Sequence, residues 1–290
     1  MNSLRMPRDA APRLRLISNL WTLWDHPSPN REWSIERKLV AIKEAGFDGF
    51  TCALNKELGR LATKHSLCTI GYISSAKPGD FRRLIRNNIE GGALRINVQL
   101  GDHDTPVDEA VRMAIRIIAT GEDLGIACDI EVHRDTCTET PEKTYAIAAG
   151  YRKATGRLLP MTWDFSHISV IKHLAPPFWK RLIVDPELIQ HACQFHFRPF
   201  NGHHCQVPVT NGHNELSTEF QQWLPVLKKT FQTWLAAKQQ GREIFACPEM
   251  GPVRGGYNLS QLPSSWEDAK ILRGIIEKTW MKALATRVGQ

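Results

Sequence analysis

The sequence lacks several features that would place it quickly in a known class of protein. Its seven cysteines are an odd number, and no two of them have the C-x-x-C spacing, which argues against a zinc-finger site or a disulfide scaffold. Four of them lie in or beside apolar runs, and we interpret these four as small buried side chains in a reducing compartment: Cys52, Cys128, Cys193 and Cys247. No apolar run approaches the roughly 20 residues that a membrane-spanning helix needs, and the N-terminal residues lack the apolar core of a signal peptide. These absences favour a cytoplasmic protein without a membrane segment.

Nucleotide-binding and metalloprotease signatures are missing as well. No G-x-G-x-x-G follows an early strand-like run, and neither G-x-x-x-x-G-K-[ST] nor H-E-x-x-H occurs. The formal net charge of +7 would attract an anionic partner if it were concentrated in one patch. The basic residues are instead spread along the chain, so we expect a basic, solvated surface and no nucleic-acid partner.

Eight short apolar runs, alternating with helix-like segments, are the main pattern that is present. The runs cover residues 13–24, 47–54, 67–74, 93–100, 127–133, 158–165, 192–197 and 243–250. Strands with almost no polar residues are typical of a parallel sheet covered by helices. Eight such units in 290 residues predict a closed (β/α)₈ TIM barrel as one domain, with residues 1–12 as an N-terminal extension. An open doubly wound sheet is the structural alternative.

Several helix boundaries can be predicted from capping residues. Asp80, Thr105 and Thr140 precede helix-like segments as N-caps, and Pro141 takes a first helical position. The segment between strands six and seven has little helix signal beyond residues 176–183. The last two helices are predicted at residues 217–241 and 264–284.

Each of the last four predicted strands ends near a residue whose side chain can bind a metal ion. Glu131, Asp164, His196 and Glu249 follow one another on strands five to eight, and the C-terminal ends of barrel strands meet at a single mouth. A lone residue of this kind could be a salt-bridged carboxylate or a core histidine. The four together predict a site for one divalent cation, because buried carboxylates are costly unless they are paired or bind a cation. Mostly oxygen ligands suit Mn²⁺ or Mg²⁺, and can also hold Co²⁺, Fe²⁺ or Zn²⁺.

Further polar and aromatic residues share these strand ends and the two loops 134–140 and 198–216. We predict that they contact a substrate: Trp21, His133, Arg134, His167, Arg198 and Gln206. Histidine and arginine can hydrogen-bond hydroxyl groups or hold an anionic group, and Trp21 with Trp24 at the first strand end could stack on a sugar ring. The alternatives are that the arginines only neutralise the carboxylates and that the tryptophans pack the pocket wall. The second loop is long enough to act as a lid or a substrate-binding arm.

At these residues the chain resembles the xylose-isomerase-like TIM-barrel superfamily, in the branch of sugar phosphate isomerase/epimerase-like proteins. The resemblance spans nearly the whole chain and rests on the ordered tetrad and on the phrases EVHRDT, DFSH, HFRPF and PEMGP. It implies a metal-dependent isomerase or epimerase, with Mn²⁺ as the first choice of ion and a carbohydrate or polyol as substrate. Glu131 and Glu249 would be both ligands and the acid/base pair that works through an enediolate, and His167 would contact substrate or metal. A homo-oligomer is compatible with it.

The chain departs from the ketose-epimerase pattern at two positions. Those enzymes carry a glutamate six residues after the strand-five ligand and an arginine six residues after the strand-seven histidine, whereas this chain has Cys137 and Gly202. A different substrate follows, and a dehydratase-type lyase that acts on a keto-sugar or inosose is the nearest alternative. Endonuclease IV, a relative with three metals, needs extra histidines where this chain offers Cys52, Tyr72 and Gln99. A catalytically silent binding barrel is the third alternative.

Overall fold

Eight parallel strands form a closed barrel in the computed structural model, which describes residues 11–213, 215–237, 240–259 and 261–288. The strands are β1 (Arg13–Asn19), β2 (Gly49–Cys52), β3 (Cys68–Ser75), β4 (Ala93–Leu100), β5 (Cys128–Glu131), β6 (Met161–Trp163), β7 (Gln194–His196) and β8 (Glu243–Cys247). The last strand pairs in parallel with the first, with Arg13 opposite Glu243. This pairing confirms the predicted TIM barrel and excludes the open sheet.

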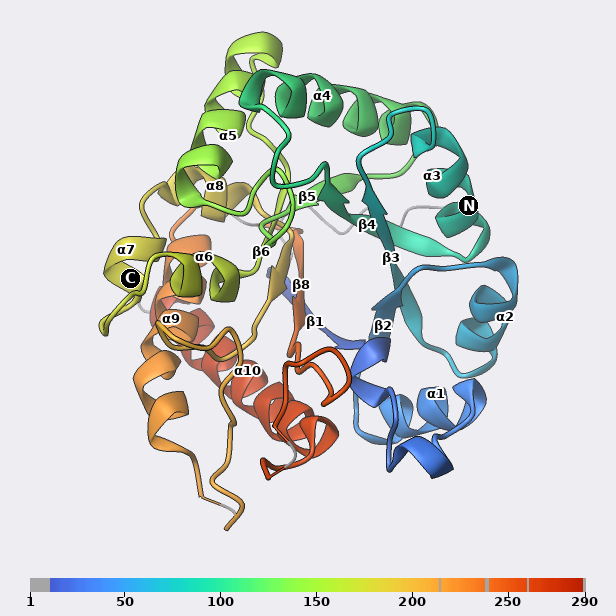
Figure 1. Ribbon diagram of the computed structural model, residues 1–290, viewed down its shortest axis with the longest axis vertical. Helices are drawn as coiled ribbons and strands as arrows, with labels where there is room; N and C mark the ends of the chain where they lie inside the picture. Colours follow the sequence, from blue (N-terminus) through green and yellow to red (C-terminus); the bar gives the residue numbers. More distant parts are fainter. Residues whose placement is uncertain (1–10, 214, 238–239, 260, 289–290) are drawn as a thin grey trace.

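A ring of helices surrounds the strands (Figure 1). They are α1 (Ile35–Glu44), α2 (Lys56–Lys64), α3 (Phe81–Glu90), α4 (Val107–Asp123), α5 (Pro141–Thr155), α6 (Phe165–Ile171), α7 (Trp179–Leu182), α8 (Pro186–His191), α9 (Thr218–Leu235) and α10 (Ser265–Val288), with the 3₁₀ turns η1 (Leu20–Leu23) and η2 (Pro29–Arg31) before α1. Strands β5, β6 and β7 are short and fully buried, because the helices cover their outer faces.

The inside of the barrel has a closed floor below the C-terminal strand ends. Ile17, Ile70 and Phe245 form a separate apolar cluster there. Alternation along β5 turns Asp129 to the same side as Glu131, and Asp129 accepts hydrogen bonds from Arg95 and from Gln194 at 2.6–2.8 Å. The floor is therefore filled by its own apolar and ion-paired groups, and a site can open only at the other end.

The first strand is shorter than predicted, and one predicted helix cap is wrong. The chain leaves β1 at Asn19, whose side chain accepts a hydrogen bond from the backbone of Trp21, so the apolar residues 20–24 form a turn in place of a strand. Asp80 is the N-cap residue of α3 as predicted, although its side chain makes no capping hydrogen bond. Thr105 precedes the cap of α4 and bonds Asp102 instead. Thr140 caps α5 as predicted.

Other boundaries follow from local packing. Helices α6 and α8 lie between strands six and seven, where little helix was predicted, and each begins at an aspartate, Asp164 or Asp185, that caps it. Helix α9 ends at Leu235 rather than at Gly241, because the residues beyond it offer no large apolar side chain to pack on the barrel. Most of the predicted N-terminal extension, residues 1–12, lies outside the described residues.

Candidate metal centre

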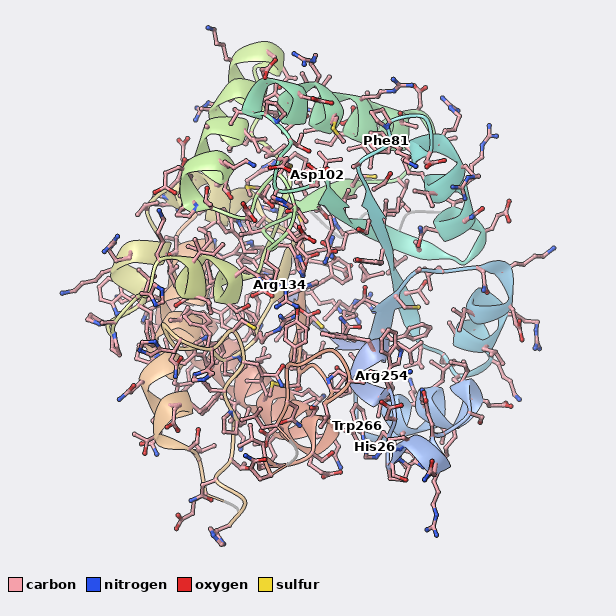
Figure 2. The ribbon with its side chains drawn as sticks, viewed as in Figure 1. His26, Phe81, Asp102, Arg134, Arg254 and Trp266 are labelled. Carbon is pink, nitrogen blue, oxygen red and sulfur yellow. The ribbon has the colours of Figure 1, made fainter. Side chains whose placement is uncertain are left out.

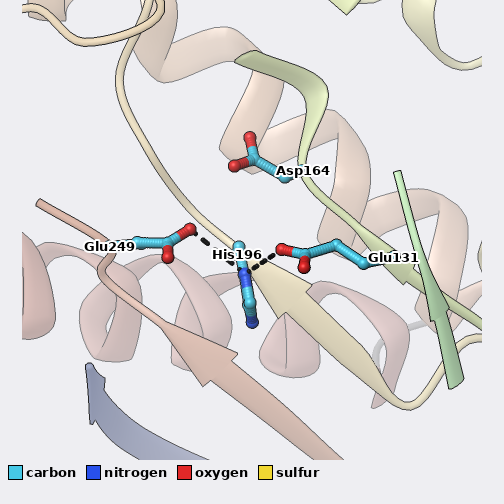
Figure 3. Close-up of side chains that lie close together, drawn as sticks. All are labelled: Glu131, Asp164, His196 and Glu249. Carbon is cyan, nitrogen blue, oxygen red and sulfur yellow. Dashed lines mark ion pairs between the residues drawn. The ribbon is translucent and has the colours of Figure 1, made fainter. Parts of the chain in front are cut away.

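The four predicted ligand residues converge at the C-terminal end of the barrel. Glu131 and His196 are the last residues of β5 and β7, Asp164 directly follows β6, and Glu249 lies just beyond β8. The four residues are at most 6% exposed, and one potential ligand atom from each lies within 4.8 Å of all the others (Figure 3). The predicted convergence is confirmed, and within the described residues no other group of three or more such side chains is this close.

The imidazole of His196 lies between the two glutamates (Figure 3). Its Nδ1 atom is 2.8 Å from Oε1 of Glu131 and 3.1 Å from Oε2 of Glu249. Asp164 is fixed from the side, because one of its oxygens accepts the backbone N–H of Ser166 at the start of α6. The same aspartate therefore begins a helix and presents its second oxygen to the cluster.

The carboxyl groups of the cluster are ionised at neutral pH. Burial acts to raise the pKa of Glu249, but Arg198 and His196 outweigh it and lower the value to about 2. Burial is likewise overcome in Glu131 by His196 and in Asp164 by Arg198, so both pKa values lie below the ordinary range. The pKa of His196 is raised well above its usual value, because Glu249 and Glu131 outweigh the effect of its burial. A cation would meet three charged ligands without any carboxyl first losing a proton.

These residues fit a divalent cation. Oδ2 of Asp164, Nδ1 of His196 and Oε2 of Glu249 are buried atoms that lie close to charged neighbours but make no hydrogen bond of good geometry to a described residue. Unsatisfied buried polar atoms are costly and call for a partner. Ligand atoms on opposite sides of one small divalent ion are roughly 4 Å apart, so a spread of up to 4.8 Å needs only small side-chain adjustments. Three oxygens and one nitrogen are a donor set for a hard or borderline ion.

A buried arginine is built into the cluster. Arg198 is 2% exposed, and its Nη2 atom lies 2.8 Å from Oε2 of Glu249 and 3.7 Å from Oδ2 of Asp164. Its guanidinium also faces the rings of Trp21 and Tyr257, at 5.7 and 4.7 Å. The arginine therefore neutralises part of the carboxylate charge, which was the alternative to a substrate contact. It pairs with Oε2 of Glu249 and Oδ2 of Asp164, two atoms that a cation would also need.

We expect Arg198→Gln to bind Mn²⁺ at least about tenfold more tightly than the wild type, because a fixed positive charge near the ion is removed. The metal-free variant should be less stable by about 3 kcal/mol, since Glu249 loses its buried ion-pair partner. Calorimetric titration with Mn²⁺ and thermal unfolding without metal measure the two effects. Arg134→Gln is the matched control, because Arg134 stacks on the same tyrosine without pairing with the cluster. Weaker Mn²⁺ binding by Arg198→Gln would contradict this interpretation.

A cavity of about 370 Å³ opens above the cluster, and three of the six predicted substrate contacts line it. Trp21, His133 and Arg198 are on its wall. His167 lies behind His133, with ring centroids 4.1 Å apart, and its Nε2 is 3.3 Å from Oδ2 of Asp164. Burial and the neighbouring His167 lower the pKa of His133 to about 4, so this imidazole is neutral at neutral pH.

Arg134 and Gln206 lie away from the cavity wall. Arg134 is exposed, stacks on the ring of Tyr257 at 4.5 Å, and projects over the middle of the barrel, whereas Arg254 lies nearer the rim (Figure 2). The side-chain amide of Gln206 exchanges two hydrogen bonds with the backbone of Gly251, at 3.0 and 2.6 Å. Both of its polar atoms are thus used to brace the loop after β8, so we do not carry Gln206 forward as a substrate contact.

The long loop after β7 is attached to its surroundings along much of its length. Asp268 in α10 accepts hydrogen bonds from the backbone of Val209 and the hydroxyl of Thr210, and Val207 bonds back to Pro199 within the loop. These contacts favour a fixed wall of the site over the lid suggested by the length of the loop.

The structure explains the two departures from the ketose-epimerase pattern. Cys137 is completely buried, and its backbone N–H is bonded to Leu100, so it does not face the cavity. At Gly202 a Cβ atom would lie 2.3 Å from the carbonyl oxygen of Leu174. No arginine side chain fits there in this conformation, and Arg198 is the arginine that reaches the cluster.

The residues of the cavity that were not predicted from the sequence include Asn19, Asn97 and Tyr257. Asn97 is a polar residue inside the apolar strand β4, a signal that could have been used. Asn19 sits at a strand end that was predicted too far downstream. Tyr257 belongs to the loop after β8, and nothing in the sequence pattern indicates that its ring reaches Arg198.

Comparison with known proteins gives structural matches alone, because neither a known protein-family profile nor a curated protein matches the sequence. An L-ribulose 3-epimerase matches with a TM-score of 0.61 and 14% identity, over 95% of this chain and 97% of the other. A xylose isomerase-like TIM barrel protein from Mycobacterium smegmatis in complex with magnesium gives 0.56 and 13%, over 92% and 98%. A probable 3-DHS dehydratase from Bacillus anthracis gives 0.52 and 14%, over 92% and 99%. The chain therefore has the fold of the xylose isomerase-like TIM barrels.

None of the described helices has the length and apolar character to cross a membrane.

Proposed function

We propose that the protein is a divalent-metal-dependent isomerase or epimerase of a sugar, a sugar phosphate or a polyol. The observation that carries the proposal is the placement of Glu131 and Glu249 on opposite sides of His196, at 2.8 and 3.1 Å from the same Nδ1 atom, with both glutamates on the wall of one cavity. Two carboxylates that face one small volume from two sides are the arrangement that proton removal and proton return require.

In the proposed reaction one glutamate removes a proton from the carbon next to a substrate carbonyl. The electron pair of that C–H bond moves into an enediolate, and the proton resides on the carboxyl group. The opposite glutamate, in its acid form, returns a proton to the other face of the same carbon, which gives an epimer, or to the neighbouring carbon, which gives an isomer. The structure supports this role through the burial of both groups, which keeps water from exchanging the abstracted proton quickly.

Glu131, Asp164, His196 and Glu249 would hold the divalent ion in this proposal. A cation held by them would act as a Lewis acid toward the substrate carbonyl and its neighbouring hydroxyl. Mn²⁺ is our first choice because the set is rich in oxygen but contains one imidazole, and Mg²⁺, Co²⁺, Fe²⁺ and Zn²⁺ are compatible with it. The magnesium complex of the structural neighbour supports a divalent ion on this fold.

A carbohydrate or polyol suits the remaining wall of the cavity. The neutral imidazole of His133 can donate or accept a hydrogen bond with a hydroxyl group, and Trp21 offers an aromatic face. We retain Arg198 as a substrate contact, because it lines the cavity and two of its nitrogens, Nε and Nη1, make no hydrogen bond to a described residue. His167 and Arg134 would act from behind and above these groups.

A dehydratase-type lyase is the second candidate, supported by the structural neighbour described as a probable 3-DHS dehydratase. Its first step would be the same: Glu131 or Glu249 takes the proton next to the carbonyl. The intermediate would then expel a β-hydroxyl group, which leaves as water after the opposite glutamate protonates it.

Solvent-deuterium exchange tests the proposed function. The Mn²⁺-loaded protein is incubated in D₂O with L-ribulose, D-tagatose, D-fructose and a keto-inositol, and products are examined by NMR and mass spectrometry. We expect deuterium to enter carbon next to the carbonyl of at least one compound, without loss of water for an isomerase and with loss of water for a lyase. Protein stripped of metal by a chelator is the control. No exchange with any compound would overturn the proposal, and cleavage of abasic DNA would then favour the endonuclease alternative.

A further inference from the structure

Two asparagines flank the cluster and have no role in the function proposed above. Asn19, the last residue of β1, donates from Nδ2 to Oε1 of Glu249 at 2.7 Å. Asn97, within β4, donates from Nδ2 to Oε2 of Glu131 at 2.8 Å. Both asparagines line the same cavity as the glutamates. One amide thus reaches each glutamate, from two strands that contribute no ligand.

The amides hold the oxygens that do not face His196. Glu131 directs Oε1 to His196 and Oε2 to Asn97, and Glu249 directs Oε2 to His196 and Oε1 to Asn19. Each carboxylate therefore has a near oxygen on the ligand side and a far oxygen held by an N–H group. The two halves of the site repeat this arrangement although they come from different parts of the sequence.

The direction of each amide follows from the groups that it faces. Oδ1 of Asn19 accepts the backbone N–H of Trp21 at 3.2 Å, and a backbone N–H can only donate, so the NH₂ group must face Glu249. Asn97 faces an ionised carboxylate, which can only accept, so its NH₂ group points to Glu131 for the same reason. The orientation of both amides is thus set by the chemistry of their partners.

A carboxylate held in this way has less freedom around a cation. To chelate an ion through both oxygens, the glutamate would have to turn its far oxygen inward and give up a short charge-assisted hydrogen bond. A carboxylate oxygen has two lone pairs, and the amide takes one of them. The far oxygen keeps a second lone pair with which it can meet a substrate proton.

We propose that Asn19 and Asn97 are positioning residues that restrict Glu249 and Glu131 to binding a cation through one oxygen each. Each amide thereby keeps the far oxygen of its glutamate available for proton transfer. The inference rests on the proposed function, because it takes the four-residue cluster as a metal centre and the two glutamates as the proton-transfer pair. It adds two residues, on strands one and four, to the group that decides how the centre works.

Co²⁺ tests the coordination part of this proposal without any substrate. The visible absorption of protein-bound Co²⁺ is stronger at low coordination number and weaker in six-coordinate sites. We expect Asn19→Ala and Asn97→Ala each to bind one Co²⁺ per chain with a loss of absorption per bound ion, because the released glutamate can chelate through both oxygens. Each variant should also slow deuterium exchange by roughly 10- to 100-fold, as is usual when a partner of a metal ligand is removed.

Asn88→Ala is the matched control. Asn88 is as buried as Asn97, but it bonds only to the backbone of Leu54, Tyr72 and Leu84. We expect its loss to destabilise the fold and to leave the Co²⁺ spectrum unchanged; if it does not fold, Asn88→Ser, which keeps a group that can donate and accept a hydrogen bond, replaces it.

The outcomes separate this proposal from the one on which it rests. Unchanged spectra and exchange rates in Asn19→Ala and Asn97→Ala would overturn it, as would the same spectral change in the Asn88 variant. Wild-type protein that binds Co²⁺ but exchanges no compound would overturn the proposed function, while the spectra would still decide the role of the asparagines. Wild-type protein that binds no Co²⁺ would overturn both.

Discussion

The Glu131→Gln, Glu249→Gln double variant is expected to exchange substrate hydrogen with solvent at least about 1,000-fold more slowly than the wild type. Glutamine keeps the size of each side chain but cannot take up a proton, and a positioned acid or base contributes typically 10²–10⁴-fold to a rate. The variant should retain some affinity for Mn²⁺, because Asp164 and His196 remain and an amide oxygen is a weak ligand. The measurement is deuterium incorporation with the best compound of the screen, at saturating Mn²⁺.

The single variants and a distant glutamate provide the controls. Each single substitution should lose nearly as much rate as the double one, since residues that act as a unit give non-additive losses. Glu243→Gln changes a partly exposed glutamate at the start of β8 that pairs with Arg15, far along the strand from the cavity, and should leave exchange unchanged. A double variant that keeps the full rate would show that the acid/base assignment is wrong.

Removal of the metal is expected to abolish exchange and to lower stability together. A ligand that binds only the folded state stabilises it by about 2.7 kcal/mol when present at 100 times its dissociation constant. For a domain of this size each kcal/mol corresponds to roughly 2–4 °C in Tm. Chelator-treated protein should therefore regain several degrees in Tm when Mn²⁺ is added back, as measured by scanning calorimetry, and regain exchange over the same range of Mn²⁺ concentration.

Asp164→Asn tests whether that stabilisation comes from the cluster. The substitution keeps the shape and the helix-capping oxygen of Asp164 but removes one charged ligand. Its Tm should respond little to Mn²⁺ at concentrations that shift the wild type by several degrees. An equal shift in wild type and variant would mean that Mn²⁺ acts at another place on the protein.

Most of the barrel could be predicted from the sequence because buried parallel strands leave a strong local signal. The fourth strand was placed correctly at residues 93–100, and all eight strands occur in the predicted order. The convergence of the ligands followed as well, since every barrel strand ends at the same mouth. Local signals failed where side chains redirect the backbone: Asn19 ends β1 early, and Asp164 and Asp185 begin short helices.

The partners of the ligands could not be predicted, because they depend on barrel closure. Asn19 and Glu249 are separated by almost the whole chain and meet only when β1 pairs with β8. The pairing of Arg198 with Glu249 arises in the same way, from neighbouring strands β7 and β8. From the sequence we expected Arg198 either to contact a substrate or to neutralise the carboxylates, and its ion pairs with Glu249 and Asp164 are the neutralising contacts.

The buried arginine also bears on the choice of substrate. Three ionised carboxylates, Arg198 and a divalent ion with neutral His196 would sum to zero charge. With no arginine at this position the same loaded centre would carry one negative charge. A neutral centre accepts the negative charge of an enediolate at lower electrostatic cost. Because Gly202 is packed against Leu174, the function that we propose would use a different arginine, Arg198, from the one expected in ketose epimerases.

Anomalous diffraction from crystals soaked in Mn²⁺ tests the central claim most directly. We predict one strong anomalous peak at the barrel mouth, within roughly 2.0–2.3 Å of one atom each from Glu131, Asp164, His196 and Glu249, and no such peak in crystals of Asp164→Asn. An empty cluster in the Mn²⁺-soaked wild type, or a peak bound elsewhere on the chain, would contradict the account.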